Sequence, residues 1–245
     1  MPAPNGQRSP APTPGMTWVP ASGYLMNGSI PVGVGLPSAV RIPVPLTNGL
    51  CIELSPRGYV PKGGSTSTLF FQDISGKRHL RLDYGYNVKS KTIDFHWNQK
   101  GTFDTFKIPD HTTVGSSGEL LYKGAKYFRY GGRVLLVVGA AIDLYSIAVA
   151  SKPIRQATKV LAGWAGAWAG CELLGGGGAA LGSFIEPGGG TAVLGAGGCI
   201  VGGIGGYWGL STAAGKIYDW AEGTIFTHLP EISAGEASTA TIPLE

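Results

Sequence analysis

Cysteine and charge are both scarce in this sequence of 245 residues. The three cysteines, Cys51, Cys171 and Cys199, are an odd number without metal-ligand spacing. They predict no zinc site and no disulfide framework, and they fit synthesis in a reducing compartment. Charged residues make up 14% of the chain and the net charge is +4, which is too small to argue for nucleic-acid binding. We therefore expect no nucleic-acid partner.

Common catalytic and targeting motifs are also missing. The sequence has no HExxH, no CxxC pair, no P-loop and no GxSxG, and its glycine runs at 175–178 and 188–190 do not follow a predicted strand. We therefore expect no metal and no cofactor. The first fifteen residues, MPAPNGQRSPAPTPG, lack the apolar core of a Sec signal peptide. The expectation is synthesis in a bacterial cytoplasm, with delivery to a membrane by a contact-dependent or injection system.

Glycine, in contrast, is abundant, and 16 of its 41 residues lie in two apolar blocks at 160–185 and 191–214. A turn at 186–190, EPGGG, separates them. Each block is about as long as the ~20 residues that cross a hydrocarbon core as a helix. The first block carries one charge, Glu172, which in a spanning segment is expected to face a partner or a water-filled lumen. From Pro187 to Gly215 there is no charge.

Small residues recur every four positions within these blocks. On a helix this spacing places them on one face, where another backbone can approach closely. The pattern predicts two antiparallel helices that pack through their glycines and associate with further copies in a membrane. The helix-packing positions are Ala162, Gly166, Gly170, Gly178, Gly182, Gly198, Gly202 and Gly206. Two other interpretations stay open: a tightly packed soluble helical core and a flexible linker.

The chain before the blocks is typical of β-structure. Short apolar runs at 17–19, 30–34, 40–44, 50–54 and 68–71 are separated by Gly and Pro. Residues 79–84 and 92–97 alternate with period two and predict a hairpin with a turn at 85–90. One face carries Leu80, Leu82 and Trp97, and the polar residues share the other. Residues 102–108 are predicted to form a further strand.

A helix is predicted from Glu119. Its basic and aromatic first half resembles a membrane-interface anchor, although a solvated helix face explains the same pattern. Its second half, 134–150, is apolar but slightly short and interrupted by Asp143, which predicts an interfacial or buried segment. The anchor residues are Lys126, Tyr127, Arg129, Tyr130 and Arg133.

These patterns predict an α+β fold, with a β-rich part followed by a helical Gly-rich hydrophobic hairpin. The expected divisions are a Pro-rich tail at 1–15, a β-rich domain at 16–118, a hydrophobic helical domain at 119–222 and a polar tail at 223–245. If the chain is an enzyme, the polar face of the β-hairpin is the place to look. His96 and His111 with Asp94 could form an acid–base pair, although a strand histidine is more often a surface residue.

The run LRLDYGYN…IDFHWNQKG…DHT, followed by LYKGAKYFRYGGRVLLVVGAAIDLYSI and WAGAWAG…GGCIVGGIGGYWG, resembles C-terminal effector regions of bacterial polymorphic toxins. Such regions occur on Rhs-type and type VI secretion carriers. The resemblance implies an antibacterial or anti-host effector with an immunity protein and a carrier or chaperone as partners. Three functions stay open: a pore-forming toxin, an enzymatic (nuclease-like) toxin whose hairpin serves translocation or anchoring, and a non-toxic membrane or structural protein.

Overall fold

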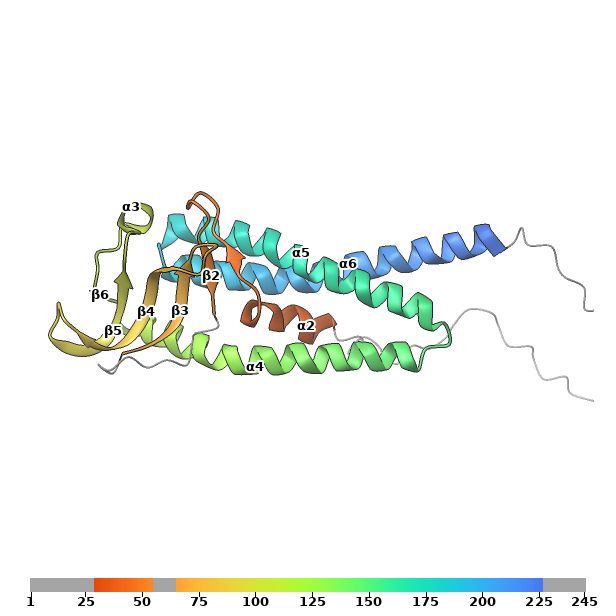
Figure 1. Ribbon diagram of the computed structural model, residues 1–245, viewed down its shortest axis with the longest axis horizontal. Coiled ribbons are helices and arrows are strands. Elements are labelled where there is room, and N and C mark those ends of the chain that lie inside the picture. The colour runs from red at the N-terminus through yellow and green to blue at the C-terminus, as the bar shows by residue number, and fades with distance from the viewer. Residues whose placement is uncertain (1–28, 55–64, 227–245) are drawn as a thin grey trace, which may run out of the picture.

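The computed structural model describes residues 29–54 and 65–226, and these form a β-sheet followed by three long helices. Six antiparallel strands lie in chain order in one sheet. Three long helices extend away from the sheet, with α4 on one side, the α5–α6 pair on the other and α2 between them (Figure 1). The predicted α+β fold is confirmed. The predictions for residues 1–15 and 17–19, and most of those for 223–245, lie outside the described residues.

Each strand pairs with its neighbour in the sequence. The predicted β-hairpin is confirmed as β4 and β5, which pair from Leu80–Gln99 to Asn87–Thr92. Its turn is shorter than predicted, because pairing continues past Gly85 to Asn87. The strands are β1 Ile42–Pro43, β2 Cys51–Glu53, β3 Thr66–Gln72, β4 Arg78–Asn87, β5 Thr92–Gln99 and β6 Thr112–Thr113.

Two predicted strands are wrong. Residues 30–34 belong to the helix α2 Ser29–Gly35, where Pro31 lies in the first turn and needs no N–H partner. Residues 102–108 contain the short helix α3 Phe103–Phe106, which turns Phe106 into the core before Lys107 adopts a left-handed conformation. In both segments a tertiary contact overrides the β-favouring composition. A 3₁₀ turn, η1 Leu36–Ser38, follows α2.

The three long helices are α4 Gly115–Ala148, α5 Pro153–Ile185 and α6 Gly189–Phe226. At 1.5 Å per residue each is about 50 Å long or longer. The two glycine-rich blocks therefore form helices, with the turn at 186–188 where it was predicted. The first helix begins at Gly115, four residues before the predicted start.

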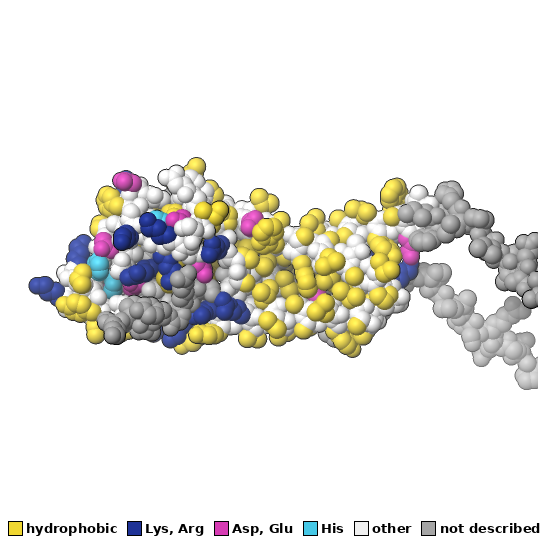
Figure 2. Space-filling view, in the orientation of Figure 1, with side chains coloured by type: hydrophobic (Ala, Val, Ile, Leu, Met, Phe, Trp, Pro, Cys, Tyr) yellow, Lys and Arg dark blue, Asp and Glu magenta, His cyan; other side chains and the backbone are white. Residues whose placement is uncertain are grey.

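The sheet packs against the turn end of the α5–α6 pair. Gly188 at that turn lies against Trp97 of β5, Gly195 against Ile52 of β2, and Gly175 against Ile42 of β1. The shared core contains Leu69, Phe71, Leu80 and Leu82. The opposite ends of the helices extend beyond the sheet, and hydrophobic side chains cover much of that surface (Figure 2). Charged side chains gather on the sheet end.

A short segment holds α4 to the α5–α6 pair. Gly33 of α2 lies against Gly203 and Ile204 of α6, and Gly35 of α2 lies against the backbone of α4 at Gly132. A Cβ atom at either α2 position would collide with these neighbours. Glycine is needed here because backbone meets backbone. Helix α2 thus lies as a wedge between α4 and the α5–α6 hairpin, and it separates them at Gly33 and Gly35.

Candidate membrane-inserting site

Close contact between α5 and α6 runs along the predicted glycine positions. A Cβ atom at Gly170 would overlap the carbonyl oxygen of Gly202, and one at Gly206 would overlap that of Gly166. The same holds for Gly182 against Gly190. Ala162 is half-buried one turn before Gly166. All seven predicted glycines face the partner helix in this way: Gly166, Gly170, Gly178, Gly182, Gly198, Gly202 and Gly206.

This contact lies within one chain. The faces of Gly198, Gly202 and Gly206 are covered by α5, so in this structure they are not available to a second copy. Other glycines of α6 are open instead: added Cβ atoms at Gly197, Gly205 and Gly209 meet nothing within 4 Å. The glycines therefore divide into an inner set that allows α5 and α6 to touch and an outer set on the surface.

A disulfide joins the two helices, contrary to the sequence analysis. Cys171 of α5 and Cys199 of α6 are bonded and lie 28 positions apart in the sequence. Both cysteines are fully buried. The sequence did not predict this disulfide because the pairing depends on the register of the two helices, which places positions 171 and 199 opposite each other. Cys51 is the one free thiol among the described residues.

Among the described residues, two helices are long and apolar enough to cross a membrane by length and composition, and they are α4 and α6. In the most apolar windows only 17% of α4 and 28% of α6 is buried inside the protein. Core helices of soluble proteins pass the same test of composition, but they are mostly buried. This finding concerns α4 as a whole, and the expectation that its apolar half, residues 134–150, is interfacial or buried stays a prediction. The first block, in α5, does not meet the criterion.

The exposed apolar surface lies on the parts of the helices beyond the sheet, residues 134–148, 153–171 and 200–226, which we call the stalk. Most soluble monomers bury such side chains or expose them singly. On the stalk they are neighbours on three adjacent helices. The exposed large side chains are Val134, Leu135, Val137, Val138, Leu144, Tyr145, Ile154, Leu161, Trp168, Val201, Trp208, Leu210, Ile217 and Trp220.

Charged residues border the stalk at the sheet end. The predicted anchor residues Lys126, Tyr127, Tyr130 and Arg133 are exposed there, and the Arg129 guanidinium lies 5.4 Å from the Tyr130 ring. From Arg133 to the end of α4 the helix rises about 22 Å, and the charge-free part of α6 rises about 40 Å. A hydrocarbon core is about 30 Å thick.

Glu172 lies outside this apolar length. It is half-buried on α5, beside the sheet. Burial raises the pKa of the Cys51 thiol, the Arg41 guanidinium opposes this rise, and the Glu172 carboxylate adds to it. The negative charge of Glu172 thus acts on a residue of the sheet, Cys51, rather than on the stalk.

The polar centre of the stalk is Asp143, which the sequence analysis treated only as an interruption. The side chain is fully buried. Its Oδ1 accepts a hydrogen bond of 2.9 Å from the Tyr207 hydroxyl, and its Oδ2 accepts one of 2.7 Å from Trp164 Nε1. One carboxylate therefore joins α4 to both helices of the hairpin. An aspartate inside a long apolar run is the sequence signal for such a contact, but its partners depend on the fold.

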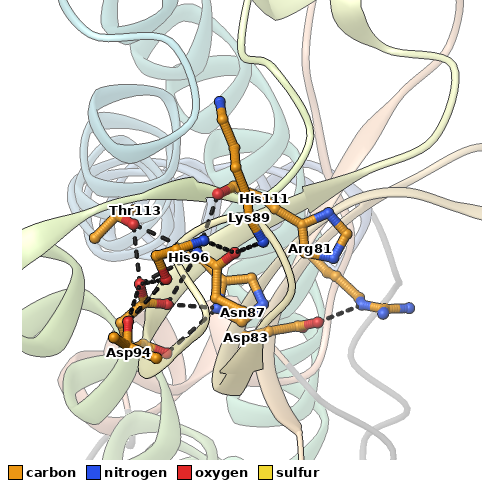
Figure 3. A network of polar contacts seen from close by, with 10 residues as sticks. Arg81, Asp83, Asn87, Lys89, Asp94, His96, His111 and Thr113 are labelled. Carbon is orange, nitrogen blue, oxygen red and sulfur yellow. Dashed lines mark hydrogen bonds and ion pairs between the residues drawn. The ribbon is translucent and has the colours of Figure 1, made fainter.

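The proposed acid–base residues also meet, around the partly buried carboxylate of Asp94 (Figure 3). His96 Nδ1 donates to Asp94 Oδ1 at 2.9 Å, and the rings of His96 and His111 stack with centroids 5.6 Å apart. Asn87, which sequence reasoning missed, donates to Asp94 and to the His111 carbonyl. Burial would raise the pKa of Asp94, but hydrogen bonds from Ser90, Asn87, Thr113 and His96 together lower it.

This arrangement seals His96, which is 1% exposed. The expectation of a surface histidine is wrong, because β6 pairs with β5 at this position and the ring of His111 stacks on His96. A pocket of about 800 Å³ lies beside the cluster, between the sheet and the first turns of α4. Asp94 and Thr113 line it, whereas His96 and His111 do not. The cluster therefore stabilises the hairpin, and it presents no histidine to a substrate in this pocket.

No group of three or more histidine, cysteine or acidic side chains suited to a metal ion occurs in residues 29–54 and 65–226. Comparison with protein-family models, curated proteins and solved structures yields no match to this chain. The class of the protein therefore rests on its fold and its site alone. It is an α+β protein with an antiparallel sheet and an apolar helical stalk.

Proposed function

We propose that this protein is an effector toxin whose stalk enters a target bilayer and makes it permeable to ions. The observation that carries the proposal is the exposed apolar surface of the stalk, which is bordered by charge at both ends. Burying this surface in lipid removes it from water, at a gain of about 25 cal/mol per Å². The helical backbone is already hydrogen-bonded internally, as a bilayer requires.

Toxicity, a secretion carrier and an immunity protein belong to the proposal through the resemblance to polymorphic-toxin effector regions. Association of several copies in the membrane is part of it too, since three helices alone leave little room for a lumen. The open glycines of α6, Gly197, Gly205 and Gly209, are the surface through which we expect copies to pack.

Release of a trapped dye from lipid vesicles tests this function. The proposal predicts release that rises steeply with protein concentration and is unaffected by divalent-metal chelation. Expression in the bacterial cytoplasm and, separately, directed to the periplasm should collapse the membrane potential in at least one case. Binding to vesicles without release would support a non-toxic membrane protein. Absence of binding at any pH would remove the proposal.

An enzymatic toxin is the second candidate, favoured by the meeting of His96, His111 and Asp94 near a pocket. It predicts that a folded His96→Ala, His111→Ala double variant loses toxicity while it still binds membranes. Retained toxicity of that variant would leave only a structural role for the two histidines.

A further inference from the structure

The end of the stalk farthest from the sheet carries paired charges. The connection between α4 and α5 lies there beside the last turns of α6; we call residues 149–159 and 215–226 the tip. Arg155 makes a two-point ion pair with Asp219, with both nitrogen–oxygen distances 2.6 Å. Lys152 pairs with Glu222 at 2.6 Å. Blue and magenta side chains meet at this end of the molecule in Figure 2.

These pairs contribute little to a protein in water. Their side chains are a third to about a half exposed, and exposed ion pairs are weak because water screens them. In a medium of low dielectric constant the same attraction becomes much stronger, and an unpaired charge becomes very costly. The pairing of these charges therefore contributes most to stability when the tip leaves water.

The position of the tip requires such a passage if the stalk inserts. The apolar surface lies between the tip and the sheet, so one of these two ends must cross the bilayer. The sheet end carries many more charged side chains, as Figure 2 shows, and a folded sheet is large. The tip is small, and its acidic residues are both paired.

We propose that the tip is the leading end of insertion, and that its two ion pairs cross the bilayer as neutral units while the sheet stays on the entry side. This inference rests on the proposed function. The remaining cations support the final position: Lys159 packs along Gly215, and Lys216 is exposed. Long cationic side chains of this kind can reach the far interface from within the apolar layer.

A charge exchange across the Arg155–Asp219 pair tests the inference. Arg155→Asp and Asp219→Arg each place two like charges together, and the combined variant restores an ion pair in the opposite orientation. We expect each single variant to insert at least about tenfold more slowly than the parent, because an unpaired charge is costly in a membrane. The combined variant should recover most of the rate. The matched control is Lys123→Glu, which breaks an exposed pair with Glu119 on the sheet side and should have no effect.

Insertion is read from a thiol at the tip, in a protein with Cys51→Ser and Ser151→Cys. A maleimide coupled to a polymer too large to pass the pore should label this thiol only when it is trapped inside the vesicles. A thiol on α3 at the sheet end, Thr105→Cys, should react only with polymer reagent added outside. Thermal unfolding in solution shows whether each variant folds, and only folded variants are compared.

Three results would overturn the inference: single variants that insert as the parent does, an exchange variant as slow as the singles, or a tip thiol labelled only from outside. The proposed function fails in a different way. In that case the parent itself neither binds vesicles nor releases dye, whatever its tip carries.

Discussion

Individual glycines decide whether α5 and α6 can touch. Gly202→Ile places a side chain where the Gly170 backbone lies, and we expect a loss of about 3 kcal/mol or more in unfolding free energy. Gly177→Ile on α5 is the matched control, because an added Cβ atom there meets nothing within 4 Å and the substitution improves helix propensity. Urea unfolding of both variants measures the difference. Equal stability would mean that the helices do not pack as described.

The same pair of variants separates packing from hydrophobicity in the membrane. Both substitutions make the α5–α6 hairpin more apolar, so partition into vesicles should persist or rise for each. Dye release should fall for Gly202→Ile, since it disrupts the hairpin. Release equal to that of the parent would show that permeability does not need the α5–α6 contact.

Asp143 holds three helices through two hydrogen bonds. Asp143→Leu replaces the carboxylate with an apolar side chain. The Trp164 N–H and the Tyr207 hydroxyl then stay buried without their acceptor. An unsatisfied buried donor costs about 1–3 kcal/mol, and we expect a loss of at least this size. Tyr207→Phe keeps the hydrogen bond from Trp164 to Asp143 and should cost less. Chemical denaturation in water checks both values. An unchanged midpoint for Asp143→Leu would contradict the geometry.

The Asp94 carboxylate makes the stability of the sheet depend on pH. Its folded pKa is lowered, so its contribution is fully present above the unfolded pKa of about 3.9 and is lost as pH falls through the folded value. We expect stability to drop below about pH 4. Asp94→Asn should be less stable than the parent at pH 7 and should lose less on acidification. Parallel pH curves for the two proteins would show that Asp94 does not carry this dependence.

At the scale of elements, the Cys171–Cys199 bond closes the hairpin. A cross-link that closes a loop of this length removes about 3–4 kcal/mol of unfolded-state entropy in the chain model. The double variant Cys171→Ala, Cys199→Ala should therefore unfold at lower temperature, and the parent should match it in reductant. Thiol counting provides the check: without reductant only Cys51 should react after denaturation. Three reactive thiols would mean that the bond is not formed.

The elements differ in how far their sequences predict them. The β4–β5 hairpin was predictable because its alternation is long and uninterrupted, and the α5–α6 helices because their four-residue spacing is repeated. The strand β3 was predictable from its short run of β-favouring residues at 68–71. The helix α2 was not, since SIPVGVG is favourable for a strand and becomes helical as a wedge between α4 and α6.

At the scale of the whole molecule, long-range contacts are what the sequence left open. The disulfide and the partners of Asp143 both depend on helix register, which no local pattern specifies. The burial of His96 depends on β6, a strand of two residues. The apolar stalk itself was visible in composition, but its division among three helices became clear only from the packing of the sheet against the hairpin turn.

The central claim is that the stalk enters a bilayer, and spin-label depth measurement tests it most directly. Labels at Leu144→Cys on α4 and Gly209→Cys on α6 report the middle of the stalk, and Thr105→Cys reports the sheet, each with Cys51→Ser. With vesicles present, the two stalk labels should relax with oxygen and be protected from a nickel chelate, while the sheet label shows the reverse. Stalk labels as accessible to nickel as the sheet label would contradict the account.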